Sequence, residues 1–246
     1  MNLLVCISKT PETTSKIAFT DNDTTFATDG VQYIMNPYDE WYALVRALEL
    51  KEAAGGTVTV VNVGPAANDV IIRKALAIGA DEAVRIDADP QSALYVAKQI
   101  ANYAKDKSYD IILTGKETID YSGALVGSMV AELLGMPFMS HASKMDIADG
   151  KATVTCDIEG GVEVISSPLP MVVSASKGLA EQRIPNMRGI MMAKRKPLNV
   201  ESSHAVDDQV KIKSYKLPEA KSGVKLVDAE NMDELVKLLH EEAKVL

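Results

Sequence analysis

Small and polar residues separate an apolar run from a helix-like pattern within residues 111–135, which read IILTGKETIDYSGALVGSMVAELLG. Gly115 ends the apolar run, and Asp120, Ser122 and Gly123 precede the helix-like part. The first amides of a helix have no partner inside the helix and lie at the positive end of its dipole. Because small residues let an anion approach those amides, the segment predicts a phosphate site. Alternatively, Asp120 or Ser122 caps the helix from within the chain.

The phosphate site needs contacts beyond this one turn. A helix dipole supplies only about 0.3–2 kcal/mol, whereas a micromolar Kd corresponds to about 8 kcal/mol. The segment matches neither GxGxxG nor GxxxxGK[ST]. The spacing by itself therefore leaves a nucleotide site and an internally capped turn open, and neighbouring loops must supply most of the affinity.

Catalytic and metal-binding patterns are missing from the sequence. His141, His204 and His240 lie far apart without HxxxH spacing, and Cys6 and Cys156 form no CxxC pair. A zinc or iron–sulfur site from this chain alone is therefore not expected, and both cysteines are predicted to be buried free thiols. No Ser-His-Asp arrangement is recognisable either. The residues indicate a protein that binds a ligand without transforming it, hence not an enzyme.

Charge and hydropathy exclude two further classes. The 246 residues carry a net charge of −8, which argues against nucleic-acid binding through a basic face. No apolar run reaches the roughly 18–20 residues of a membrane span, so no membrane insertion is expected. The start, MNLLVCISKTPETT, lacks a basic lead and predicts a first strand instead of a signal peptide, which favours a cytoplasmic protein.

Apolar runs alternate with helical patterns along the first 135 residues. We expect strands at 3–8, 57–65, 82–87 and 109–115, and helices at 36–56, 67–80, 89–108 and 122–135. Asn36 is a cap candidate for the first helix, which Gly55 ends, and Asp89 precedes Pro90 at the third. Strands that are apolar on both faces and alternate with helices predict an α/β fold with a parallel sheet between helices.

The loops that follow parallel strands meet along one edge of the sheet, where open α/β folds bind ligands. Three segments are expected at that edge: 36–39, 63–66 and the segment at 115–126. A hairpin or meander at 16–36 precedes the first of them.

The pattern changes after residue 136. We expect a hairpin at 152–168 around Gly160 and Gly161, a strand at 170–176, few helix or strand signals at 177–200, an extended arm at 201–230 and an amphipathic helix at 231–246. The organisation is thus predicted as one domain over 1–200 and a tail over 201–246.

Methionines and isoleucines lie among basic residues in the segment 181–196, EQRIPNMRGIMMAKRK. Exposed methionines form an adaptable contact surface. Whether they are exposed or pack onto the core stays open, because their spacing fits neither a helix nor a strand. The terminal helix either docks on another subunit or folds back on its own domain.

Together these segments resemble the β subunit of electron-transfer flavoproteins along essentially the full chain. The matching pieces are LLVCISKTPETT, DGVQYIMNPYDEWYALVRALELKE, VNVGPA, IRKALAIGADEAVRI, DIILTGKETIDYSGALVGSMVAELLG, EGGVEVI and AEQRIPNMRGIMMAKRK. The resemblance implies a Rossmann-like, adenine-nucleotide-binding domain with a C-terminal arm and helix that docks on the partner. It also implies a heterodimer with an α subunit, which carries most of an FAD site.

Nucleotide contacts follow from the same resemblance. The β subunit buries AMP in most members and a second FAD in electron-bifurcating ones. The implied contacts are Cys6, Asn36, Pro37, Tyr38, Asp39, Val63, Gly115, Lys116, Glu117, Thr118, Ile119, Asp120, Tyr121, Ser122, Gly123, Ala124, Leu125 and Val126. Thr13 and Tyr38 would lie towards the flavin at the subunit interface. DYSGALVG replaces the family's polar DDxxQTG-like stretch, which leaves AMP and FAD both open.

Electron partners are also implied. The segment 181–196 corresponds to the family's recognition loop, with Arg183, Met187, Ile190 and Met191 as contact residues. Met187, where the family commonly has leucine, would enter a pocket on an acyl-CoA dehydrogenase. Electrons would pass from such dehydrogenases through the shared FAD to a quinone oxidoreductase and the respiratory chain.

Two other functions are alternatives to this one. A stand-alone, stress-protein-like nucleotide sensor of similar fold would be a stable monomer or homodimer with its terminal helix on its own core. An adenylating enzyme of a related fold would need an SGGxDS-type loop after the first strand, and ISKTPETTS lacks it.

Overall fold

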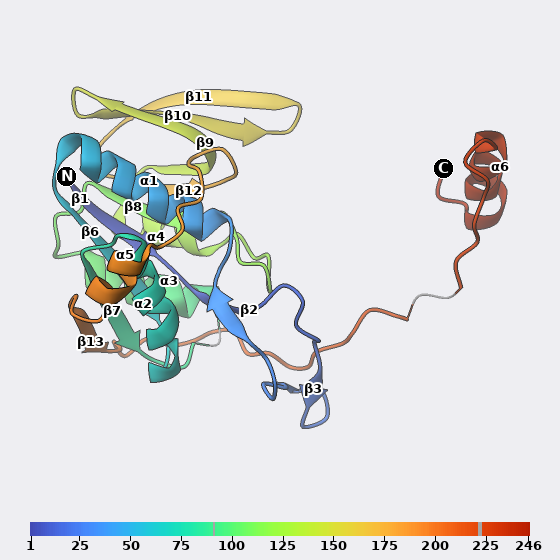
Figure 1. Ribbon diagram of the computed structural model, residues 1–246, viewed down its shortest axis with the longest axis horizontal. Coiled ribbons are helices and arrows are strands. Elements are labelled where there is room, and N and C mark those ends of the chain that lie inside the picture. Colours follow the sequence, from blue (N-terminus) through green and yellow to red (C-terminus); the bar gives the residue numbers. More distant parts are fainter. Residues whose placement is uncertain (91, 221–222) are drawn as a thin grey trace. The chain divides into compact units, whose positions relative to one another are not determined.

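The structure is a computed structural model that describes residues 1–90, 92–220 and 223–246 (Figure 1). The chain divides into two compact units, Met1–Ser214 and Tyr215–Leu246, and each is described here by itself. The predicted boundary at residue 200 falls within the last strand of the first unit.

The first unit is built on a nine-stranded sheet in the order β11-β10-β9-β12-β8-β1-β6-β7-β13. From β9 to β13 neighbouring strands are parallel, whereas β10 pairs antiparallel with both β9 and β11. The strands are β1 (Asn2–Cys6), β6 (Thr57–Val63), β7 (Glu82–Asp87), β8 (Ile111–Gly115), β9 (Phe138–Ala148), β10 (Lys151–Ile158), β11 (Gly161–Pro168), β12 (Met171–Ala175) and β13 (Leu198–Ser202). The predicted α/β class is confirmed.

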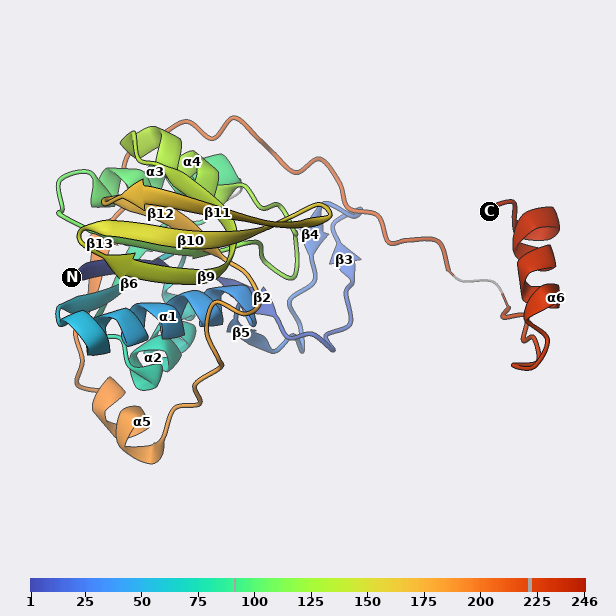
Figure 2. The same ribbon diagram turned by 90° about the horizontal axis from the view of Figure 1, so that it is seen from above.

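Helices cover both faces of the sheet (Figure 2). They are α1 (Asp39–Ala54) and α2 (Asp69–Ile78) on one face, and α3 (Ala93–Ala104) and α4 (Val126–Leu134) on the other. Side chains of a strand point alternately to the two faces. Leu3 and Val5 of β1 therefore join the core under α1 and α2, while Leu4 and Cys6 join the core under α3 and α4.

Strand order reverses between β1 and β8. The chain proceeds from β1 to β6 and β7 on one side, then crosses to β8 and β12 on the other. Loops leaving the carboxyl ends of β1 and β8 consequently diverge to opposite faces, and the crevice they leave is where open α/β sheets bind ligands.

The residues that cap α1 and α3 differ from the predicted ones. Asn36 is not the cap of α1, since Tyr38 occupies that position without a side-chain hydrogen bond. Asp89 does not cap α3, since Ser92 accepts a hydrogen bond from Tyr95 N. The predicted helix end at Gly55 is confirmed.

Replacing Ser92 with alanine is expected to lower the free energy of unfolding by about 1 kcal/mol, the usual value of an N-cap. Urea unfolding measures this. Ser92→Asn keeps a capping oxygen and should remain close to wild type, so equal losses in the two variants would contradict the capping role.

Two short ladders lie beside the main sheet. β2 (Lys9–Pro11) pairs antiparallel with β5 (Tyr33–Met35), and β3 (Phe19–Thr20) pairs with β4 (Thr25–Phe26). The β3–β4 ladder confirms the hairpin expected within 16–36, whereas β2 lies before that range. A single 3₁₀ turn, η1 (Ala66–Asn68), leads into α2.

Several elements were not predicted from the sequence, β2 among them. β9 was not predicted, and the segment 177–200, expected to contain few elements, holds α5 (Met187–Ala193) and most of β13. β13 adds to the edge of the sheet beside β7. Beyond it, Gln99 of α3 exchanges two hydrogen bonds of 2.8 Å with the backbone of His204, so the chain remains tied to the domain past residue 200.

The second unit contains α6 (Met232–Lys237), which continues into a π-helical turn, η2 (Leu238–Ala243). Asn231 caps α6 by accepting from Glu234 N. The apolar side chains of α6, Met232, Leu235 and Val236, are exposed within the unit. Among the described residues, no helix is both long and apolar enough to cross a lipid bilayer.

Candidate functional site

The carboxyl ends of β1, β6 and β8 lie side by side and carry the candidate site. Cys6 ends β1, Val63 ends β6 and Gly115 ends β8. The connection 36–39 leads into α1, and the loop 116–125 leads into α4. The fold therefore brings the predicted nucleotide contacts to one edge of the sheet.

Asn36 joins two of these strand exits. Its side chain is fully buried, its Nδ2 donates to Glu117 O at 3.0 Å and its Oδ1 accepts from Ile119 N at 3.0 Å. Its backbone N–H donates to Ser8 O at 3.0 Å. Asn36, which does not cap α1, thus fixes the loop after β8 to the exit of β1.

Glu40 lies beneath the same crevice. The residue is 6% exposed, and its carboxyl oxygens accept hydrogen bonds from Ser8 N at 2.7 Å and Ser8 Oγ at 2.5 Å. Burial raises the pKa of Glu40 to about 8, although the bonds from Ser8 oppose the shift. Glu40 is buried because the first turn of α1 packs closely against β8.

Gly115 permits this close approach. A Cβ at that position would lie 2.8 Å from Glu40 Cγ and 3.1 Å from Glu40 N. Gly115 is therefore required for packing α1 on β8. Burial also raises the pKa of the neighbouring Cys6 thiol, and Glu40 adds to the effect.

The loop 116–125 has a different shape from the one predicted. The helix begins at Val126, four residues later than the expected start at Ser122. Ser122 and Ala124 have φ angles of 48° and 51°, a left-handed conformation that a helix cannot contain. The first helical amides without an intrahelical partner accordingly belong to Val126 and the two residues after it.

Access to the loop backbone is open. Residues 119–125 are exposed, and a Cβ on Gly123 would meet nothing within 4 Å. Gly127 has a structural role instead, because a Cβ there would lie 2.6 Å from Thr114 Oγ1 and 3.0 Å from Phe138. Exposed loop amides followed by unpaired helix amides fit a phosphate group.

The exit of β6 is held by a network that the sequence reading missed. Asn62 Nδ2 donates to Ile7 O at 2.8 Å and Asn62 Oδ1 accepts from Asn68 at 2.9 Å. Arg85 donates to Gly64 O at 3.0 Å. Asn62 was detectable as the one amide in the otherwise β-branched run VTVVNV, but its partners were not.

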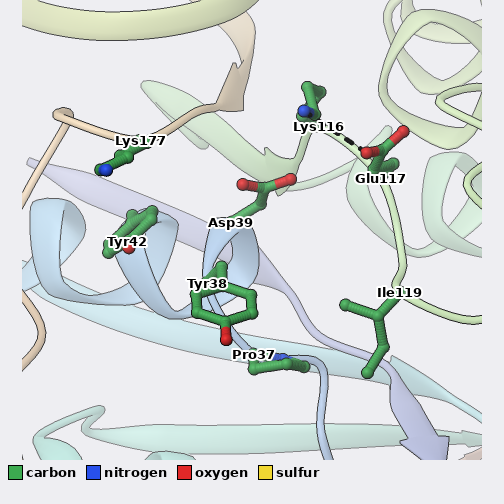
Figure 3. Close-up of a pocket in the computed structure, with 8 residues that line it drawn as sticks. All are labelled: Pro37, Tyr38, Asp39, Tyr42, Lys116, Glu117, Ile119 and Lys177. Carbon is green, nitrogen blue, oxygen red and sulfur yellow. Dashed lines mark ion pairs between the residues drawn. The ribbon is translucent and has the colours of Figure 1, made fainter. Parts of the chain in front are cut away.

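A pocket of about 260 Å³ opens beside α1 and the start of the loop (Figure 3). Tyr38, Asp39, Lys116 and Glu117 line it, as predicted site residues, together with Lys177, which the sequence reading missed. Tyr38 has a φ of 63° and is 54% exposed. Burial raises the pKa of Asp39, and Lys116 partly offsets this effect.

The two residues expected to face a flavin are separated within this chain. Thr13 follows the Pro11 end of the β2–β5 ladder, and Tyr38 follows the Met35 end. Because the strands are antiparallel, these are opposite ends of the ladder. The Thr13 hydroxyl donates to Glu12 at 2.8 Å.

The expected partner-recognition residues lie away from this edge, near α5. Met187, Ile190 and Met191 belong to α5 and are 75%, 44% and 68% exposed. Arg183 instead pairs with Glu52 of α1 at 2.6 Å. The methionines are therefore available at the surface, whereas the arginine is committed to the domain.

Comparison with known proteins gives consistent matches. The family model described as electron transfer flavoprotein domain matches residues 23–206. The chain is 38% identical to the electron transfer flavoprotein subunit beta of Bacillus subtilis, covering all of both chains. It is 37% identical to that of Syntrophomonas wolfei, over 93% of this chain and 90% of the relative. It is 33% identical to the mitochondrial subunit of Oryza sativa subsp. indica over all of both chains.

Proposed function

Because the chain belongs to the electron transfer flavoprotein β-subunit family, we propose that it binds a structural adenine nucleotide and, with an α subunit, holds the FAD that carries electrons. The nucleotide is AMP, or a second FAD if the complex is electron-bifurcating. The nucleotide contacts are the residues at the three strand exits. The bound FAD supplies the redox chemistry, for which the side chains of this subunit provide no centre of their own.

The nucleotide site is supported by one observation above the others. Asn36 fixes a loop of exposed amides at the point where strand order reverses, next to the unpaired first amides of α4. Small or open positions such as Gly123 leave that backbone accessible. Full-length similarity to β subunits favours this role over a stand-alone nucleotide sensor.

Mass spectrometry of ligands released from the denatured heterodimer tests the proposal. We expect one FAD and one AMP for each pair of subunits, and a visible flavin spectrum before denaturation. Two FAD molecules would identify the bifurcating alternative. A purified heterodimer without flavin absorbance would contradict the proposed function.

Electron donors are proposed to be acyl-CoA dehydrogenases and related flavin dehydrogenases, with a quinone oxidoreductase as acceptor. The exposed methionines of α5 supply the contact surface. Anchoring side chains at protein interfaces typically contribute more than 1 kcal/mol, and the strongest of them 2 kcal/mol or more.

Met187→Ala is accordingly expected to slow electron uptake from a dehydrogenase about tenfold, because it removes an exposed anchor. Stopped-flow flavin reduction measures the rate, and absorbance measures the flavin content, which should not change. Leu133→Ala, which truncates a partly exposed side chain of α4, is the control. Loss of flavin in step with the rate would show that Met187 packs the fold instead.

A further inference from the structure

A groove of about 560 Å³ runs between α2 and the segment 185–194. Figures 1 and 2 show that α5 lies beside α2. Its lining includes Val70, Arg73 and Lys74 of α2 and Ile190, Ala193 and Lys194 of the facing segment. This surface is separate from the strand exits that form the nucleotide site.

Contacts between α5 and α2 fix both walls of the groove. Arg73 Nη1 donates to Ala193 O at 2.8 Å and to Lys196 O at 2.7 Å. Gly189 allows close contact, since a Cβ there would lie 2.4 Å from Ala77 O. Because α5 is held from several sides, the groove is preformed and does not need a partner to open it.

Lys196 closes the same contact at the C-terminal end of α2. Its Nζ donates to Leu76 O at 2.9 Å and to Gly79 O at 3.3 Å. A lysine at this position satisfies carbonyls that the helix leaves unpaired and interacts favourably with the negative end of its dipole. The charge of Lys196 is thereby used within the fold.

The other basic side chains of residues 183–196 do not bind a helix carbonyl of the described chain as Lys196 does. Residues 183–196 contain five basic residues and no acidic one, in a chain of net charge −8. Within the part of the chain that the structure describes, Arg188, Lys194 and Arg195 form no ion pair. Lys74 stacks over the Trp41 ring at 4.6 Å and also lacks an acidic partner there.

Apolar side chains lie between these cations. Val70 is 77% exposed on α2 and Ile190 is 44% exposed on α5, and buried Ala77 and Ala193 line the groove between them. Exposed apolar surface rimmed by charge is typical of protein interaction sites. A concave surface also fits a protruding side chain better than a flat lipid bilayer.

We propose that this groove receives an acidic and apolar segment of the partner dehydrogenase. An apolar side chain of the partner enters between Val70 and Ile190, and neighbouring carboxylates lie over Lys74 and Lys194. The inference rests on the proposed function for the class of partner. It adds a second kind of contact to the one made by Met187. Met187 projects from this chain towards the partner, whereas the groove accepts a side chain of the partner.

Charge reversal in the flavin-containing heterodimer tests the proposal. Lys74→Glu combined with Lys194→Glu is compared with Lys105→Glu combined with Lys107→Glu. The second pair makes the same charge change on the opposite face of the sheet, and it too includes a lysine over an aromatic ring, Lys107 over Tyr103 at 4.3 Å. Val70→Trp fills the groove without changing its charge.

The readout is the KM for heterodimer when a purified, substrate-reduced acyl-CoA dehydrogenase donates electrons. We expect KM to rise about tenfold or more in the groove pair, with kcat and flavin content unchanged and with a weaker dependence of KM on salt. Val70→Trp should also raise KM. If the groove pair fails to fold, Val70→Trp alone decides.

Equal KM values for the groove and control pairs, with Val70→Trp unchanged, would overturn the inference while Met187→Ala still reports on the proposed function. A wild-type heterodimer without flavin or without electron uptake would overturn both. Sedimentation of the wild type, but not the groove pair, with phosphatidylglycerol vesicles would identify a membrane as the occupant and reject the protein partner.

Discussion

Replacing Asn36 with leucine is expected to lower the free energy of unfolding by about 2–4 kcal/mol and to release the adenine nucleotide from the heterodimer. Leucine has nearly the shape of asparagine but can neither donate nor accept a hydrogen bond. Glu117 O and Ile119 N would lose their partners beneath the loop. The loop amides would then no longer be held in position for a phosphate. Urea unfolding and the nucleotide-to-protein ratio measure the two effects.

Gln99 provides a matched control. It is a second fully buried amide that exchanges two hydrogen bonds with backbone atoms, those of His204, but it lies on α3. Gln99→Met should reduce stability to a similar extent and leave the nucleotide bound. Equal nucleotide loss in both variants would show that Asn36 acts only through overall stability.

Glu40→Gln is expected to make the protein more stable at pH 8 relative to wild type, by about 3–5 kcal/mol. The pKa of Glu40 is raised from 4.5 to about 8 in the folded chain, mainly by burial and with smaller effects of Asp120 and Asp39. Between these pH values the folded chain keeps a proton that the unfolded chain has released. Stability from this group is therefore complete below pH 4.5 and falls as pH rises through 8. Glutamine is neutral at every pH, so the stability of the Glu40→Gln variant lacks this dependence on pH.

Urea unfolding of both proteins at pH 5, 6, 7 and 8 measures the difference. The curves should converge at pH 5 and separate as pH rises. Glu52→Gln serves as the control, because pairing with Arg183 lowers the pKa of Glu52, so that its contribution to stability changes only below pH 4.5 and its curve should run parallel to that of wild type between pH 5 and 8. Parallel curves for wild type and Glu40→Gln would mean that the buried carboxyl is already ionised at neutral pH.

Local patterns in the sequence were sufficient for the architecture of the first 135 residues. Short apolar runs became β1, β6, β7 and β8, and the apolar spacing between them became α1 to α4. These signals work because each reports a periodicity of the chain itself, and a strand that is apolar on both faces has to lie between two layers. The order of strands and helices along the chain was enough to predict which edge of the sheet carries the candidate site.

Elements whose stability comes from distant contacts were missed. β13 alternates weakly but pairs with β7, more than a hundred residues earlier in the chain. α5 has only seven residues and is held by Arg73 and by the close approach of Gly189 to Ala77. A helix this short is not stable in isolation, so its own sequence carries little signal.

The sequence by itself therefore determined which strand exits meet and that small residues stand there. Only the tertiary structure decided what those residues do. Gly115 serves the packing of α1, and Glu40 is buried under Ser8. Asn36 holds a loop 81 residues away in sequence instead of capping the helix beside it. The physical reason is that a buried polar group must find a partner wherever the fold places one, and spacing along the chain does not encode that distance.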